Sequence, residues 1–223
     1  MSNATSPARI WLVRHGQTDW NAQRRIQGHT PTDLNAAGRA EAAMLAGWFA
    51  TRQFASVWSS DLPRAAQTAA VIAAAIRLPV HTSPLLRERE LGQFEGKTWD
   101  QVRQMRSELT GSPLQNGDLA DWTGIPGVET DQQLWRRVSG LLHQVAAENS
   151  GDVLVVSHGG VIKHTICHVL GLPSGSPRRF PLSNGITAVL TLRQDGFYLQ
   201  SLLDIGLLAG APQSADTAMA PSA

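Results

Sequence analysis

The chain has 223 residues and a formal net charge of +1; 42% of its residues are hydrophobic and 17% are charged. A chain of this length and apolar content can bury a sizeable core, which excludes a protein that is disordered throughout. Because the two signs of charge nearly balance, there is no general attraction to nucleic acid or to an anionic membrane. Any anion site must therefore be a local cluster of cations.

The sequence also bears on the compartment and the domain count. The first eight residues lack the basic start and apolar core of a signal peptide, and no apolar run is long enough to cross a membrane. The single cysteine, Cys167, cannot form an intrachain disulfide, which agrees with a reducing compartment. We expect a cytoplasmic protein with one domain over residues 1–208 and a disordered Ala/Pro/Ser-rich tail over 209–223.

The first apolar run, residues 10–13, predicts a strand that is buried on both faces. Arg14, His15 and Gly16 follow it, and ligands of open α/β sheets bind beyond the carboxyl ends of the strands. An arginine binds phosphate in a fork geometry, and a neutral imidazole is a competent nucleophile. From this stretch alone, a phosphate site and a solvated strand end are both open.

The rest of the chain alternates between helical and extended patterns. Asn35 is the expected N-cap of a helix to Ala50, and Asp61 is the expected cap of the next helix, which ends near Ile76. The inward stripe of the first of these helices is predicted to be Ala40, Ala43, Met44, Leu45 and Phe49. Further helices are predicted over 98–109, 130–145 and 161–170, and further strands over 54–58, 79–81, 153–156, 186–192 and 197–203. Residues 19–33, 85–96 and 110–127 are expected to be loops, the last of which could form a lid.

This alternation predicts an α/β protein, a three-layer α/β/α sandwich with a mostly parallel central sheet. The strand over 153–156 ends in Ser157, His158 and two glycines, which repeats the pattern of the first strand. Arg64 lies in the first turn of its helix, where anions bind. Since parallel strands gather their carboxyl ends at one edge, we expect Arg14, His15, Arg64 and His158 to meet there.

Five segments of the chain carry polar or glycine-containing motifs: Leu12–Thr18, Gln27-Gly28 with Asp33-Leu34 and Gly38, Ser59–Ala69, Leu86–Gly96, and Val156–Ile162. In this order they resemble branch 1 of the histidine phosphatase superfamily, which includes cofactor-dependent phosphoglycerate mutases and related phosphatases. They cover roughly the first 170 residues, and five motifs in order make a chance match improbable.

The resemblance implies a role for each matching residue and implies neither a metal nor a cofactor. His15 would attack phosphorus to form a phosphohistidine, and Glu88 would give a proton to the leaving oxygen. The phosphate oxygens would be held by Arg14, Asn21, Gly28, Arg64, His158 and Gly159. Glu90 and Glu95 remain alternatives for the acid, and Asn21 could instead cap a loop. His164 and His168, four residues apart, could bind a metal, but no carboxylate accompanies them as in a zinc-protease helix.

Three functions remain in view, and the first is favoured. It is a metal-independent phosphomonoesterase acting on a small phosphorylated metabolite, with no nucleic-acid or membrane partner and a homodimer left open. The second is a phosphoglycerate mutase, but Leu91 stands where mutases of the family carry tyrosine, and Arg103 and Arg106 do not match their paired arginines. The third, a catalytically silent phosphate-binding module, conflicts with the complete set of predicted catalytic residues.

Overall fold

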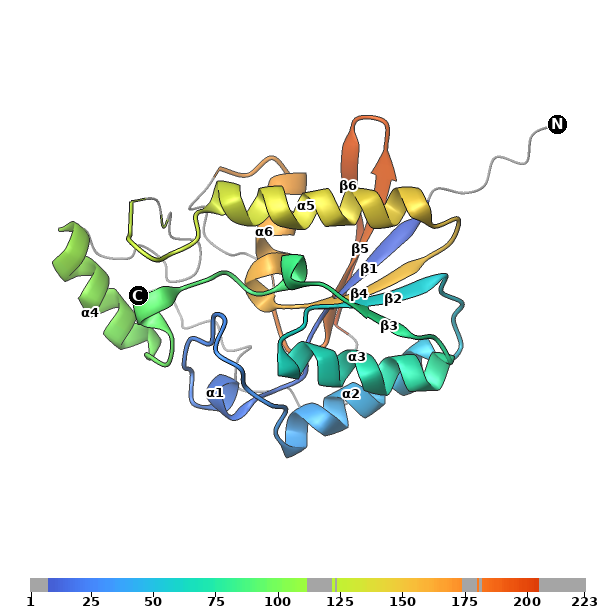
Figure 1. The fold of residues 1–223 in the computed structure, drawn as a ribbon, viewed down its shortest axis with the longest axis horizontal. Helices are drawn as coiled ribbons and strands as arrows, with labels where there is room; N and C mark the ends of the chain where they lie inside the picture. The colour runs from blue at the N-terminus through green and yellow to red at the C-terminus, as the bar shows by residue number, and fades with distance from the viewer. Residues whose placement is uncertain (1–7, 112–121, 123, 174–179, 181, 205–223) are drawn as a thin grey trace.

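The computed structural model describes residues 8–111, 122, 124–173, 180 and 182–204 (Figure 1). Six strands form one sheet in the order β3-β2-β4-β1-β5-β6. The strands are β1 (Arg9–Arg14), β2 (Ser56–Ser59), β3 (Val80–Thr82), β4 (Val153–Ser157), β5 (Ile186–Arg193) and β6 (Gly196–Asp204). The first four run parallel, and β5 is antiparallel to both of its neighbours. This confirms the predicted α/β class and the mostly parallel sheet.

The two central strands, β1 and β4, are buried along nearly their whole length, as apolar runs in a parallel sheet should be. Their register pairs Leu12 with Val155 and Arg14 with Ser157. The next residue of each strand is a histidine, so His15 and His158 leave the sheet side by side. The strand pairing by itself therefore brings the two predicted polar turns to one edge.

Helices cover both faces of the sheet and complete the three layers (Figure 1). The helices α2 (Ala36–Phe49) and α3 (Pro63–Ile76) lie on one face, and α5 (Asp131–Glu148) and α6 (Gly159–Val169) lie on the other. The alternation along β1 divides the core accordingly: Trp11 and Val13 pack towards α2 and α3, whereas Ile10 and Leu12 pack towards α5 and α6.

A third apolar cluster lies outside these layers, and we call it the α4 lobe. It packs α4 (Trp99–Thr110) against the segment around the short 3₁₀ helix η2 (Gly92–Phe94). Its buried members are Ile26, Leu91, Phe94, Val102, Trp122, Ile125 and Val128. Figure 1 shows α4 at one end of the molecule, on the same side as the short helix α1 (Asp19–Ala22).

Two details of the sequence interpretation were wrong. In α2, Ala40 and Ala43 are exposed, and the buried residues are Gly38, Ala42, Leu45, Ala46 and Phe49. The buried face is set by Gly38, where a side chain would collide with the backbone of Gln17. Asp61 does not cap α3. Its carboxylate instead forms a bidentate ion pair with Arg87, and Leu62 occupies the cap position without a side-chain bond.

Several segment boundaries also differ or lie beyond description. The predicted loop over 19–33 contains α1, and α6 begins at Gly159 rather than at residue 161. The expected tail over 209–223 and most of the expected lid over 110–127 lie outside the described residues. None of the helices in the described ranges is long and apolar enough to span a membrane.

Candidate active site

The turn after β1 is held from several sides, which fixes the backbone of His15. Its amide donates to the carbonyl of Ser157 at 3.0 Å, and its carbonyl accepts from Asn184 Nδ2 at 2.9 Å. The next residue, Gly16, lies against α2, where a Cβ would stand only 2.4 Å from the carbonyl oxygen of Gly38. A glycine is therefore required here for the turn to pack against the helix.

The His15 ring is buried, and its hydrogen bond fixes its tautomer. Nδ1 lies 2.7 Å from the carbonyl oxygen of Gly16, which can only accept, so Nδ1 carries the proton. Burial, followed by the charges of Arg64 and Arg14, holds the pKa of His15 well below its usual 6.5. Near neutral pH the ring is thus neutral and Nε2 keeps its lone pair, as a nucleophile requires.

His158 faces His15 from the end of β4. The two ring centroids are 5.1 Å apart, with 62° between the ring planes. Nε2 of His158 lies 2.8 Å from the hydroxyl of Ser60, which also accepts the amide proton of Leu62 at 3.3 Å. Burial and the nearby cations, Arg64 first, hold the pKa of His158 well below 6.5. If Ser60 donates to Nε2, then Nδ1 carries a proton, and Nδ1 is buried without a partner among the described residues.

Arg64 is fully buried at the start of α3, and its hydrogen-bond partners are neutral. Nη1 donates to the carbonyl of Thr30 at 3.0 Å and to the hydroxyl of Thr32 at 3.2 Å, and Nη2 donates to the carbonyl of Gly28 at 2.8 Å. Nε is buried and has no acceptor in the described part of the chain. Burial is the main cause that lowers the pKa of Arg64 to about 10. A buried cation with an unused donor is an arrangement that favours an anion as ligand.

Arg14 ends β1 and lies beside the amino terminus of α6. Its guanidinium donates to the carbonyl of Leu182. At Gly159, a Cβ would stand 3.2 Å from Arg14 Nε, so a larger residue would press on the guanidinium. The first amides of α6 add partial positive charge at this point. The amino terminus of α6 and Arg14 thus both offer positive charge to an anion.

Glu88 reaches the same helix terminus from the other side. Its Oε2 accepts from the amide of Gly160 at 2.9 Å, and its Oε1 accepts from the amide of Arg89 at 2.8 Å. A Cβ on Gly160 would lie 2.2 Å from Oε1, so the approach of the carboxylate depends on this glycine. The carbonyl of Glu88 accepts from His29 Nε2 at 2.8 Å.

The two other acidic candidates are placed differently. Glu90 is exposed. The carboxylate of Glu95 accepts from the amide of His29 at 2.9 Å and from both the amide and the hydroxyl of Thr30. Gly28, with a φ of +50°, passes so close that a Cβ would lie 2.1 Å from Glu95 Oε1. Glu95 therefore shapes the turn whose carbonyls hold Arg64.

Asn21 and Gly28 both form hydrogen bonds to other residues of the protein. The Asn21 amide oxygen accepts from the amide and the hydroxyl of Thr18 in a capping box that starts α1. This is the loop-capping alternative, and any contact of Asn21 with phosphate would fall to its Nδ2. The carbonyl of Gly28 holds Arg64, so its contribution runs through that side chain.

Comparison with known proteins agrees with this arrangement. The model of the histidine phosphatase superfamily (branch 1) matches residues 10–205. The chain belongs to that family. It is 40% identical over 159 residues to phosphoglycerate mutase-like protein 4 of Arabidopsis thaliana, covering 70% of this chain and 68% of the relative. It is 36% identical over 179 residues to the probable phosphoglycerate mutase GpmB of Proteus mirabilis, covering 78% and 80%.

Solved structures of similar fold include phosphatases. A mycobacterial glucosyl-3-phosphoglycerate phosphatase in complex with VO3 has a TM-score of 0.75 at 28% identity, over 87% of this chain and 98% of the other. A phosphoserine phosphatase of Entamoeba histolytica in complex with 3-phosphoglyceric acid has a TM-score of 0.73 at 27% identity, over 88% and 97%. The relatives of this histidine phosphatase family member are thus phosphatases and mutase-like proteins.

The structure also brings in residues that the sequence analysis had not selected. Ser60 and Asn184 contact the two histidines, and His29 contacts the main chain of Glu88. Ser60 lies inside the 59–69 motif and could have been found there, whereas Asn184 follows the last matching motif. The His164 and His168 pair does not meet at a common point: His164 contacts Arg89, and His168 stacks on the ring of Trp135. In the described ranges, no three His, Cys, Asp or Glu side chains are grouped to hold a metal ion.

Proposed function

We propose that this chain is a metal-independent phosphomonoesterase that hydrolyses a small phosphorylated metabolite through a phosphohistidine on His15. The observation that carries the proposal is the state of the His15 ring. Its Nδ1 is engaged with the Gly16 carbonyl, which leaves Nε2 unprotonated. Its neutral form is favoured by burial and by Arg64 and Arg14, the cations that would bind the substrate. The site can therefore hold a phosphate dianion beside a neutral nucleophile.

The first half of the reaction transfers the phosphoryl group to His15. Arg14, Arg64, the Nδ1 proton of His158 and the amide of Gly159 would hold the nonbridging oxygens. Nε2 of His15 attacks phosphorus, and the bond between phosphorus and the ester oxygen breaks. Glu88 gives its proton to that oxygen, and the alcohol leaves. Fixed positive charge and positioning supply most of the acceleration in phosphoryl transfer.

The second half transfers the phosphoryl group to water. Glu88, now a carboxylate, accepts a proton from the water that attacks phosphorus, and the bond from phosphorus to Nε2 breaks. Inorganic phosphate leaves, and His15 and Glu88 return to their starting states. The contacts of Glu95 with His29 and Thr30, and the exposure of Glu90, support Glu88 as the residue in this role.

Metal independence is part of the proposal because the two arginines can supply the charge that metal ions supply in many phosphoryl-transfer enzymes. Arg64 is positioned by three neutral acceptors, so its charge is available to the phosphate rather than neutralised by a carboxylate in contact. A cytoplasmic location and the absence of nucleic-acid and membrane partners belong to the same proposal.

A phosphoglycerate mutase is the second candidate, favoured by the names of the curated relatives. Such an enzyme needs further cations to hold a second phosphate or a carboxylate. Arg89 and Arg137, which both contact Glu88, are ion-paired with Asp131 and Glu129. Together with Leu91 at the tyrosine position, these pairings support hydrolysis over mutase activity.

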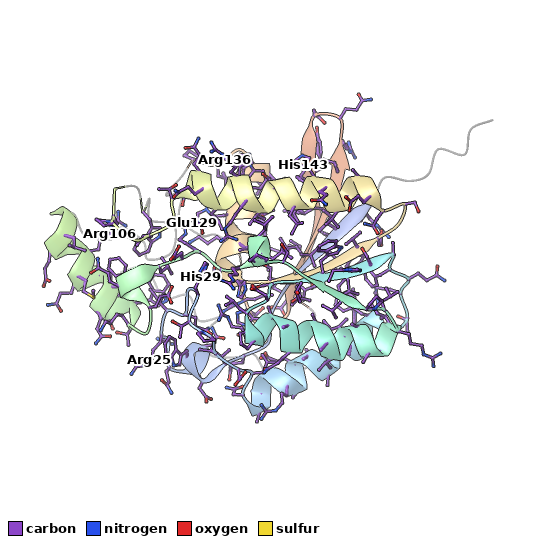
Figure 2. The ribbon with its side chains drawn as sticks, viewed as in Figure 1. Arg25, His29, Arg106, Glu129, Arg136 and His143 are labelled. Atoms are coloured by element: carbon purple, nitrogen blue, oxygen red, sulfur yellow. The ribbon has the colours of Figure 1, made fainter. Side chains whose placement is uncertain are left out.

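The test is release of phosphate from p-nitrophenyl phosphate in excess EDTA. We expect activity in the wild type, none in His15→Ala, and full activity in His143→Ala, a control on an exposed histidine of α5 that Figure 2 labels. An alkaline quench should trap phosphohistidine in the wild type only. Activity that EDTA removes, or activity that survives in His15→Ala, would overturn the proposal. Brisk conversion of 3- to 2-phosphoglycerate with a bisphosphoglycerate primer would establish the mutase instead.

A further inference from the structure

The guanidinium of Arg137, in the second turn of α5, uses all five of its donors. Nε and Nη2 bind the two carboxylate oxygens of Glu129 at 2.6 and 2.8 Å. Nη1 donates to the carbonyls of Leu85 at 2.7 Å and Arg87 at 2.8 Å, and Nη2 donates to the carbonyl of Glu88 at 2.9 Å. Because arginine has five N–H groups, none is left for another partner. Three of the five bonds hold the main chain of one segment, residues 85–88.

The next two residues of the chain, Arg89 and Glu90, are also bound to Glu129. The amide of Glu129 donates to the carbonyl of Glu90 at 2.9 Å, and its carbonyl accepts from Arg89 Nη1 at 2.8 Å. Figure 2 shows Glu129 just before α5, beside the ribbon that leads towards the α4 lobe. The side chains of Glu129 and Arg137 are only 12% and 17% exposed, so little water competes for these bonds.

The backbone at Glu88 has no regular secondary structure of its own to hold it. It lies between the 3₁₀ helix η1 (Pro84–Leu86) and η2, in a stretch without helix or strand. Its carbonyl nevertheless has both of its lone pairs used, one by His29 and one by Arg137. The main chain of Glu88 is therefore fixed by side chains from two other parts of the fold, while its carboxylate rests on Gly160.

We propose that Arg137 is a positioning residue for proton transfer: by holding the carbonyls of residues 85, 87 and 88, it keeps the carboxyl group of Glu88 in register with the leaving oxygen. This inference rests on the proposed function, in which Glu88 is the acid. Arg137 itself touches neither phosphate nor His15 in this role. A displacement of about 1 Å in a catalytic group can lower a rate by about 10²-fold, so a firm anchor is valuable.

Arg137→Lys would remove the directed hydrogen bonds and keep the positive charge. Its ammonium has three donors and no planar fork, so it cannot replace five directed bonds. It keeps the positive charge that helps to lower the pKa of His158, so an effect of Arg137→Lys reports on the lost bonds. Glu129→Gln is a second, milder variant that weakens the ion pair and leaves Arg137 in place.

The experiment compares two substrates that differ in their need for an acid. p-Nitrophenolate leaves readily without a proton, whereas phenolate gains more from protonation. We expect Arg137→Lys to lower kcat/KM by about 10²-fold for phenyl phosphate and by no more than about threefold for p-nitrophenyl phosphate. Because kcat/KM covers only steps up to the first phosphoryl transfer, hydrolysis of the phosphohistidine does not obscure the comparison. Glu129→Gln should show the same preference more weakly.

The controls separate failure of this inference from failure of the proposed function. Arg136→Lys alters an exposed neighbour on α5 (labelled in Figure 2) and should leave both substrates unaffected. Glu88→Gln should show the substrate preference in its strongest form. If Glu88→Gln shows the preference and Arg137→Lys, folded by circular dichroism, slows both substrates equally, the inference is wrong and the proposed function stands. If Glu88→Gln shows no preference, the acid assignment fails and the inference fails with it. Should Arg137→Lys not fold, the same comparison is decided by Glu129→Gln.

Discussion

Replacing Arg64 with methionine separates the proposed binding role of this residue from its structural role. The side chain is fully buried, and the acceptors of its hydrogen bonds are all neutral oxygens. Methionine has a similar length and no charge, so it fills the space without offering a donor. We expect Arg64→Met to fold, to lose the stabilisation that inorganic phosphate gives to the wild type, and to lose most of its phosphatase activity.

Two opposing effects set the expected stability of Arg64→Met. The fall in the pKa of Arg64 from 12.5 to about 10 corresponds to roughly 3 kcal/mol of unfavourable charge burial. Methionine removes this penalty, but it leaves the carbonyls of Gly28 and Thr30 without their donor, at about 1–3 kcal/mol for each buried group. These effects largely offset each other, so the free energy of unfolding should change by no more than about 3 kcal/mol. Loss of one donor to the transferred group should lower kcat by about 10²- to 10³-fold.

The assay is urea unfolding with and without inorganic phosphate, combined with p-nitrophenyl phosphate kinetics. Phosphate should stabilise the wild type by an amount that grows with its concentration, and it should not stabilise Arg64→Met. Arg77→Met, an exposed site at the other end of α3, serves as the control and should behave as the wild type. The reasoning is refuted if Arg64→Met keeps its stabilisation by phosphate, or if it retains activity within about tenfold of the wild type.

Two further predictions concern the histidines. The pKa values of His15, His158 and His164 all lie below the 6.5 expected in the unfolded chain. Below pH 6.5 the unfolded state therefore binds more protons than the folded state. The free energy of unfolding should fall on acidification below that pH, by up to about 1.4 kcal/mol per pH unit for each histidine. Urea unfolding between pH 7 and pH 5 in phosphate-free buffer checks this, and a flat profile would contradict it. Ser60→Ala should lower kcat/KM about tenfold by releasing the tautomer of His158, with Ser60→Thr restoring it; unchanged ¹⁵N shifts of His158 in Ser60→Ala would show that Ser60 does not set the tautomer.

The fold was largely predictable because its signals are local. The runs in β1 and β4 are apolar enough to demand burial on both faces, and their register then follows from the packing of the two layers. Boundaries and caps were less predictable. Asp61 was assigned to a cap from its position, but a carboxylate can satisfy a distant arginine as readily as a nearby amide, and Arg87 decided the outcome.

The candidate site, like the fold, was predictable only in part. Arg14 ends a buried strand, and His15 and His158 directly follow buried strands, so strand order alone predicts their meeting. The bonds from Arg137 to residues 85–88 and from Asn184 to His15 could not be predicted, because the acceptors are main-chain carbonyls. A backbone acceptor leaves no mark on the sequence, since every residue carries one. Side chains that organise an active site through such acceptors become visible only in three dimensions.

The α4 lobe packs separately from the layers of the sheet. Its apolar cluster shares no residue with the two clusters on the faces of the sheet, so its packing can change without disturbing the strands that carry the histidines. Glu95 is one connection between the two: it directly follows η2, and its carboxylate accepts hydrogen bonds from the turn whose carbonyls hold Arg64. A substitution inside the α4 cluster, with Glu95 retained, should therefore change the packing of α4 while Arg64 and the two histidines keep their places.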